Sequence, residues 1–496
     1  MPDSWLDTDG PRAERTSAPA RAFRIERDPL GELAVPVDAL YGIQTERARQ
    51  NFPISGLLPL ARFVTAVVAI KKAAALTHRE TGRLERRLAD AIVQAADEVL
   101  GGEHRDQFVV DPYQAGAGTS HNMNCNEVLA NRANELLGGR RGEYMPVHPN
   151  DHVNMAQSTN DVIPTAIRLA ALLEMAALLE AQEQLARAFL ARGQAFDSIL
   201  KSARTHLQDA TPIRLGQEFT AYGRICERSR ERVARAADPL RELGIGGSAV
   251  GTGLNVEPAY PKLVVRHLQE ITGLTLREGS DRVQLMQSLG DVTGFSGALR
   301  AYAADLGKIA SDIRLLASGP RTGFAEINLP PVQPGSSIMP GKVNPSIAEM
   351  VNMVCYQVIG NDVCVGVAAE AGQLELNVMM PVIAHNLLFT MMILANATRV
   401  FAERCVSGIT ADAEQCAYWL ERSPAIVTAL APRIGYAEAA RLAKEAVAQN
   451  VTVRELVRRK GLLSDAELDQ VLDLRAMTEL GVPGARPPKP AGDAGH

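Results

Sequence analysis

The stretch from residue 346 to residue 371, SIAEMVNMVCYQVIGNDVCVGVAAEA, is a long apolar run that decides the class of fold. Few charged residues follow Glu349 within it. A helix that is apolar on most of its faces must be buried on most of its faces. A bundle within one chain supplies that cover, and a bundle shared between chains supplies it more readily. We therefore expect a long-helix bundle within a homo-oligomer.

Several further helical runs surround this stretch, and they predict a mainly all-α fold. Gly82 divides the first of them into two helices, and Thr211-Pro212 predicts a helix that begins with proline in its first turn. Alternation typical of strands is confined to Phe23–Val37. The runs are Leu60–Leu100, Pro164–Phe196, Ile213–Leu243, Leu285–Ser318 and Asn377–Cys405.

Changes in composition and in the length of the expected helices along the chain predict three domains between two tails. Residues 1–22 and 477–496 are rich in Pro, Ala and charged or small residues and are expected to be disordered. An N-terminal domain spans 23–159, a central helical bundle spans 160–405, and a small helical domain of short elements spans 406–476. In that last domain, Ser464 and Glu467 form a capping box, and Thr452 caps another helix.

Composition excludes several classes of protein. The 496 residues are 46% hydrophobic and 22% charged, which is too apolar for a disordered chain, and the net charge of −5 argues against nucleic-acid and anionic-membrane binding. The six cysteines form no CxxC pair, so we expect reduced thiols in the cytoplasm and no zinc site. Pro381–Ala397 is apolar but short for a membrane span, which favours a buried helix.

Four polar segments lie between the helical runs and contain the candidate site residues. They are residues 116–124, 148–161, 204–209 and 334–345. Each alone is equally typical of turns and helix caps. Together they supply hydroxyls, amides, a histidine and a lysine with few acids, which suits the binding of carboxylates. His148 and His152 are spaced for a shared metal ion, but Pro149 lies between them. Gly246–Gly253 lacks the residues of a phosphate loop and predicts a tight turn between helices.

The fourth segment, GSSIMPGKVNP at 335–345, is a loop that its prolines and glycines keep out of helix and strand. Serine acts as a base only when its oxyanion is held by backbone N–H groups or by a cation in a site closed to water. A loop flanked by glycine can supply such groups and can close over a substrate. No GxSxG elbow is present, which argues against a hydrolase triad.

This loop resembles the signature loop of the aspartase/fumarase superfamily, and the other three segments match the same family in the same order. The similarity extends from about Arg24 to about Asp473. Tyr41–Thr45 and Ala369–Met379 resemble the aspartate ammonia-lyase branch more than the class II fumarase branch, whereas Met353–Cys355 resembles fumarase. The resemblance implies three domains with a central long-helix bundle that assembles into a tetramer core.

The resemblance also implies a reaction: reversible deamination of L-aspartate to fumarate and ammonia. Ser336 would remove the proton next to the β-carboxylate, giving an aci-carboxylate intermediate, with its oxyanion supported by the amides of Ile338 and Met339. His206 and Lys342 complete the catalytic set. Thr119, Ser158, Thr159 and Ser337 match the groups on the β-carboxylate; Thr205, Lys342 and Asn344 match those on the α-carboxylate; Asn160 and His206 match those near the departing amine.

The same resemblance implies no cofactor, no metal, a dicarboxylate as small-molecule partner, and a homotetramer whose sites are shared between three subunits. In the family a second dicarboxylate site lies around the segment that matches His148–His152. Three alternatives stay open: a class II fumarate hydratase, in which His206 would help to protonate the departing hydroxide; a lyase acting on another aspartate derivative; and a catalytically silent structural member.

Overall fold

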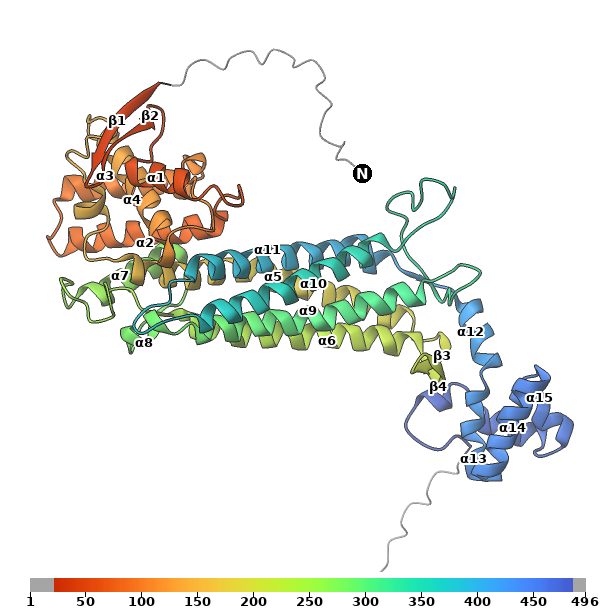
Figure 1. The fold of residues 1–496 in the computed structure, drawn as a ribbon. Helices are drawn as coiled ribbons and strands as arrows, with labels where there is room; N and C mark the ends of the chain where they lie inside the picture. The colour runs from red at the N-terminus through yellow and green to blue at the C-terminus, as the bar shows by residue number, and fades with distance from the viewer. Residues whose placement is uncertain (1–21, 485–496) are drawn as a thin grey trace, which may run out of the picture. The chain divides into compact units, whose positions relative to one another are not determined.

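A computed structural model describes residues 22–484, and it is mainly helical (Figure 1). The predicted all-α class is therefore confirmed. The tails predicted at 1–22 and 477–496 lie outside the described residues, apart from residue 22 and residues 477–484. The described chain divides into two compact units, and the predicted boundaries of three domains stay a prediction.

Among the described residues, the first unit contains residues 22–174, Pro239–Thr293 and Cys364–Phe389. Its antiparallel hairpin pairs Phe23 with Pro36 through to Asp28 with Gly31, as the alternation in that segment predicts. Its elements are β1 (Phe23–Asp28), β2 (Gly31–Pro36), α1 (Ile43–Asn51), α2 (Ala61–Glu80), α3 (Arg86–Leu100), η1 (Arg105–Gln107), η2 (Gly116–Gly118), α4 (Thr119–Leu136), η3 (Pro149–Val153), β5 (Glu242–Leu243), α7 (Tyr260–Thr272), β6 (Arg277–Glu278) and α8 (Arg282–Gln287).

The second unit contains Met175–Asp238, Gly294–Val363 and, within the described part of the chain, residues 390–484. Four long helices have residues in both units: α5 (Thr159–Ala195), α9 (Gly290–Leu316), α10 (Ser346–Glu370) and α11 (Met380–Arg404). The other elements, including η4 where the units join, are β3 (Leu200–Thr205), β4 (Gln208–Arg214), α6 (Leu215–Ala236), η4 (Asp238–Arg241), β7 (Ile327–Asn328), η5 (Val406–Gly408), β8 (Thr410–Ala411), α12 (Ala413–Arg422), η6 (Pro424–Ala429), α13 (Ala431–Ile434), α14 (Tyr436–Gln449), α15 (Val453–Lys460), α16 (Asp465–Val471) and η7 (Ala476–Thr478).

The core of the second unit is a bundle of α5, α6, α9, α10 and α11, which run side by side (Figure 1). Aromatic packing joins α5 to α6 and to α11, and side-chain hydrogen bonds join the remaining neighbours. The contacts that close the ring are Phe189 with Phe219, Tyr222 with Asp312, Asn352 with the Gly307 carbonyl, Asn361 with Thr390, and Phe189 with Phe401.

Two helix predictions need correction. The helix expected from Ile213 begins at Leu215, because Pro212 lies in β4 rather than in a first helical turn. The helix expected over Leu285–Ser318 is broken into α8 and α9, with Ser288 in extended conformation at the break. The predicted break between α2 and α3 is confirmed, and Gly82 there has a φ of +74° that suits glycine. The caps at Thr452 and Ser464 are also confirmed.

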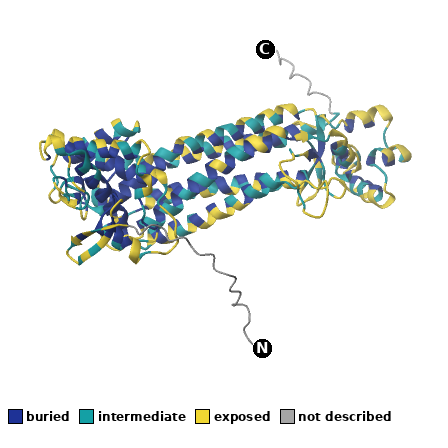
Figure 2. Ribbon diagram, turned by 90° about the horizontal axis from the view of Figure 1, so that it is seen from above, coloured by how far each residue is buried: buried dark blue, intermediate teal, exposed yellow. Residues whose placement is uncertain are grey.

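Three helices are long and apolar enough to cross a membrane by length and composition: α5, α10 and the segment Met380–Gly408 that includes α11. Packing inside the protein accounts for the apolar surface of α5, whose most apolar window is 72% buried. The corresponding window of α10 is only 33% buried, and exposed positions recur along the long helices (Figure 2). The apolar surface of α10 therefore needs a further explanation.

Candidate active site

The loop at 335–344, in the second unit, holds its first serine in a nest of backbone amides. Ser336 Oγ accepts hydrogen bonds from the N–H groups of Ile338 at 3.2 Å and Met339 at 3.0 Å. Ser336 is half-buried. Two N–H donors aimed at one hydroxyl oxygen stabilise that oxygen when it loses its proton, because the negative charge gains two dipoles that are already in place.

The base of this loop is closed by hydrogen bonds that do not involve the serine. The Gly335 N–H donates to the Lys342 carbonyl at 2.8 Å, and Asn344 Nδ2 donates to the Gly335 carbonyl at 2.7 Å. A side chain at Gly335 would place its Cβ 2.5 Å from that Lys342 oxygen, so only glycine fits. An amide nitrogen carries two N–H groups, so Asn344 Nδ2 can donate a second hydrogen bond. Ser337 and Lys342 are exposed.

Thr205 and His206 lie at the tip of the β3–β4 hairpin, which the sequence did not indicate. Thr205 pairs with Gln208, and the two residues between them, His206 and Leu207, have φ of 54° and 57°. Such a two-residue turn normally contains Asn or Gly, since positive φ is costly for other residues. Without Gly or Asn at these positions, the sequence carries no signal for a hairpin here.

A buried ion-pair cluster anchors the hairpin below its tip. Glu326 is fully buried and lies 2.9 Å from Lys201 Nζ and 2.9 Å from an Arg204 Nη1 atom. Lys201 also pairs with Glu218 at 2.9 Å. Because a buried charge left without its partner is strongly destabilising, this cluster fixes β3 and therefore the position of Thr205 and His206.

In the first unit, Thr119 is the first residue of α4 and is exposed. The chain reaches it through Ala117 and Gly118, which have positive φ of 61° and 91°. A Cβ on Gly118 would lie 3.0 Å from the side chain of Ile163, so α4 begins in close contact with α5. Thr119 is thereby placed beside the α5 segment that carries the next candidates.

Ser158, Thr159 and Asn160 lie at the start of α5, half-buried, with each polar side chain in a hydrogen bond. Ser158 Oγ accepts from the Asn160 N–H at 3.2 Å, and Thr159 Oγ1 accepts from Asn122 Nδ2 at 3.3 Å. Asn160 Nδ2 donates to the Ala249 carbonyl at 2.8 Å. These contacts fix the direction in which each group can hydrogen-bond a ligand.

Beneath these residues lies a buried lysine that sequence analysis missed. Lys71 is fully buried, and its Nζ donates to Asn154 Oδ1 and Gln157 Oε1, both at 2.9 Å. Asn122 Nδ2 also donates to Asn154 Oδ1, at 3.2 Å. Burial lowers the pKa of Lys71 to about 8, which leaves it charged at neutral pH. The available signal was its position on the buried face of α2, among Val67, Val68 and Ala74.

The glycine-rich turn at 246–253 binds a carboxylate of its own chain. The N–H groups of Gly246 and Ser248 both donate to Asp161 Oδ2 at 3.0 Å, and Ser158 N–H donates to Asp161 Oδ1 at 2.9 Å. Burial raises the pKa of Asp161 to about 6. The amides that would hold a phosphate are thus already occupied, which agrees with the prediction of a tight turn rather than a phosphate loop.

Comparison with known proteins identifies the family. A family model described as lyase matches residues 31–360, and one described as fumarase C C-terminus matches residues 426–479. The chain belongs to the aspartase/fumarase superfamily of lyases. Its members include an aspartate ammonia-lyase of Bacillus subtilis (strain 168), which is 48% identical over 464 residues that cover 94% of this chain and 98% of the relative.

Two further relatives are as similar in sequence to this lyase as the aspartate ammonia-lyase is. A fumarate hydratase class II of Halobacterium salinarum is 50% identical over 461 residues, covering 93% of this chain and 98% of the relative. The crystal structure of a fumarate lyase:delta crystallin from Brucella melitensis bound to cobalt is 48% identical, has a TM-score of 0.89, and covers 92% of this chain and 100% of that one. Overall identity alone therefore does not separate the two activities.

The candidate residues of this lyase fall into three groups. Thr119 and Ser158–Asn160 lie in the first unit, whereas the hairpin tip and the 335–344 loop lie in the second. Among residues 22–484, no hydrogen bond joins one group to another. The convergence of the three groups stays a prediction from the family resemblance.

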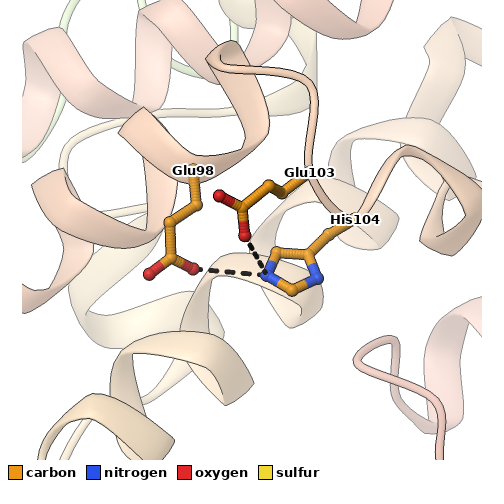
Figure 3. Close-up of side chains that lie close together, drawn as sticks. All are labelled: Glu98, Glu103 and His104. Carbon is orange, nitrogen blue, oxygen red and sulfur yellow. Dashed lines mark hydrogen bonds and ion pairs between the residues drawn. The ribbon is translucent and has the colours of Figure 1, made fainter.

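Two histidine-containing clusters of the lyase have structural explanations. His148 Nδ1 accepts from the N–H groups of Asn150 and Asp151, and His152 Nδ1 accepts from the His148 N–H, so both histidines cap η3. A second cluster joins His104 to Glu98 at 3.2 Å with Glu103 nearby (Figure 3). Arg132 donates to both oxygens of Glu98, at 2.6 and 3.0 Å, so the cluster is an ion-pair network that already contains its cation.

His121, in the first polar segment, is a buried imidazole whose protonation should destabilise the fold. It is buried against Phe63 with ring centroids 4.7 Å apart, and neither ring nitrogen has a hydrogen-bond partner among the described residues. Burial lowers its pKa from 6.5 to about 4. Between these two values the unfolded chain binds the proton more tightly, so stability falls as pH falls, by about 3 kcal/mol in all.

We predict that His121→Leu removes this pH dependence. Relative to the parent, the free energy of unfolding of the variant should rise by about 2 kcal/mol between pH 7.5 and pH 5, because the variant has no buried imidazole to protonate. Urea unfolding at the two pH values measures the difference. Phe63→Leu, which disrupts the same stack without removing a titratable group, is the control and should change stability equally at both pH values.

Proposed function

We propose that this lyase is an aspartate ammonia-lyase that reversibly converts L-aspartate to fumarate and ammonia. The observation that carries the proposal is the Ser336 hydroxyl held by the N–H groups of Ile338 and Met339, on the loop that matches the family's signature. Relatives named aspartate ammonia-lyase, at 44–49% identity over at least 90% of the chain, support the choice of substrate.

In the proposed mechanism the Ser336 oxyanion takes the proton from the carbon next to the β-carboxylate. The electron pair left on that carbon delocalises into the carboxylate, giving a doubly negative aci-carboxylate. Hydroxyl donors from Thr119, Ser158, Thr159 and Ser337 strengthen as this charge grows, which lowers the barrier. The bond to nitrogen then breaks, its electrons leave with the amine, and fumarate forms. Thr205, Lys342 and Asn344 hold the α-carboxylate, and Asn160 and His206 lie by the amine.

We propose further that the enzyme is a cytoplasmic homotetramer whose sites combine residues of three subunits. The exposed face of α10 supports this assembly. Met353, Tyr356, Ile359 and Val363 recur at three- and four-residue spacing, with exposed fractions of 67, 63, 38 and 60%. A continuous apolar stripe of this kind is the usual contact surface between helices, so it matches a second copy of the same bundle.

Class II fumarate hydratase is the second candidate, because the Halobacterium salinarum relative with that name is 50% identical. The departing hydroxide must then be protonated, which would assign that role to His206. A lyase for another aspartate derivative and a catalytically silent member remain the further alternatives.

We predict that the purified enzyme forms fumarate from L-aspartate and aminates fumarate when ammonium is added. Fumarate absorbs in the ultraviolet, so its appearance can be followed directly with L-aspartate, L-malate, 3-methylaspartate, argininosuccinate or adenylosuccinate as the sole substrate. Turnover should be fastest with L-aspartate. Turnover of malate without turnover of aspartate would overturn the proposal in favour of the hydratase.

A further inference from the structure

The glycine-rich turn at 246–249 and the start of α5 are joined through one buried carboxylate in the first unit. Asp161 is fully buried and accepts from Gly246 and Ser248 on the turn and from Ser158 on α5. An ionised carboxylate accepts hydrogen bonds and donates none. It therefore holds the turn against the Ser158–Asn160 segment with these two amides directed toward α5.

The 246–249 turn, held in this position, sets the orientation of the Asn160 side-chain amide. A backbone carbonyl is only an acceptor, so the group that meets the Ala249 oxygen must be Asn160 Nδ2, at 2.8 Å. The other end of the amide, Oδ1, is thereby directed away from the turn. No hydrogen bond from a described residue reaches that oxygen. Asn160 consequently presents an acceptor to a ligand.

The two neighbouring hydroxyls present the opposite polarity. Ser158 Oγ and Thr159 Oγ1 each accept a hydrogen bond from within the protein, which leaves the O–H proton of each free to donate. Asn122, the donor to Thr159, is itself oriented by Asn154, whose Oδ1 is fixed by the donor-only Lys71. The segment thus offers two donors and one acceptor, the pattern that matches a carboxylate next to an ammonium group.

We propose that Asp161 is a positioning residue: through the 246–249 turn it keeps Asn160 Oδ1 directed at the substrate, where it accepts a hydrogen bond from the ammonium group that departs. This inference rests on the proposed function. An ammonium group has donors only, so it loses its contact if the Asn160 amide turns over. A hydroxyl can donate or accept, and a ligand with nothing at that position is indifferent.

The test measures binding in a Ser336→Ala background, in which ligands are not consumed. Calorimetric titrations with L-aspartate, L-malate and succinate compare an ammonium, a hydroxyl and a hydrogen at the same carbon. Adding Asp161→Asn should weaken the binding of L-aspartate by about 10- to 100-fold, which is the loss expected for one hydrogen bond to a charged group. The affinity for succinate should change by less than about threefold. L-Malate should fall between the two.

Asp111→Asn is the matched control, because Asp111 is a buried carboxylate of the same unit that accepts from the Ser55 and Gly56 N–H groups and makes no contact with Asn160. It should leave the ratio of aspartate to succinate affinity unchanged. If Asp161→Asn does not fold, Asp161→Glu decides, because it keeps the acceptor-only charge and should show a smaller loss of the same selectivity.

An equal loss for aspartate and succinate would reduce Asp161 to a structural role and overturn the inference, as would no loss for either ligand. Failure of the proposed function looks different. In that case the protein with Asp161 intact does not form fumarate from L-aspartate, whatever the variant binds.

Discussion

Ser336→Ala is expected to lower kcat for L-aspartate by about a thousandfold, the usual contribution of a positioned proton-transfer group. The hydroxyl that the variant lacks is the atom that the Ile338 and Met339 amides hold. The loop should keep its shape, because its base is closed by the Gly335 and Asn344 hydrogen bonds, which do not involve the serine side chain. Fumarate absorbance measures the rate.

Two controls make this result interpretable. Gln333→Ala changes an exposed residue just before the loop and should leave kcat within about twofold, as is usual for surface substitutions. Succinate affinity should be preserved in Ser336→Ala, which separates loss of chemistry from loss of the site. A Ser336→Ala enzyme with near-normal turnover would remove this residue from the mechanism.

The long helices could be predicted because their signal is local. Each contains many turns with apolar residues at helical spacing, so burial of the same face favours the helix along the whole segment. The β3–β4 hairpin could not be predicted, since its turn is made by His206 and Leu207 rather than by Gly or Asn. Its conformation depends instead on the buried partner Glu326, more than a hundred residues away.

The sequence allows a set of candidate site residues to be proposed, but it does not give the network of hydrogen bonds around them. The hydroxyls and amides of the four polar segments follow from the sequence. The direction in which Thr159 can donate depends, through Asn122 and Asn154, on Lys71, which reaches Asn154 across 83 residues of chain. A lysine among alanines and valines looks like an ordinary helical residue until its neighbours are known, because long basic side chains commonly extend to the surface.

The second large effect is expected from charges placed on the exposed face of α10. Met353→Glu combined with Val363→Glu should dissociate the proposed tetramer and abolish activity, because the stripe would then carry two unpaired carboxylates into each contact between subunits. Burial of a side chain of this size contributes about 1.5–3 kcal/mol, and the loss recurs at each copy. Sedimentation analysis measures the assembly and fumarate absorbance measures the activity.

Val447→Glu is the matched control, because Val447 is 65% exposed on α14 and lies outside the stripe. It should leave both assembly and turnover unchanged. A double α10 variant that remains tetrameric would show that the stripe is not the contact surface. An α10 variant that becomes monomeric and stays fully active would refute shared sites.

Mixing of inactive variants tests the shared site directly. Ser336→Ala removes a residue of the second unit, and Thr159→Ala removes one of the first. If a site takes these residues from different subunits, reassembly of the two variants together should generate some sites with neither substitution, and activity should return in part. If both residues of a site come from one chain, every site in the mixture carries a substitution and no activity returns. Because the readout is a gain of activity, misfolding of either variant cannot imitate it.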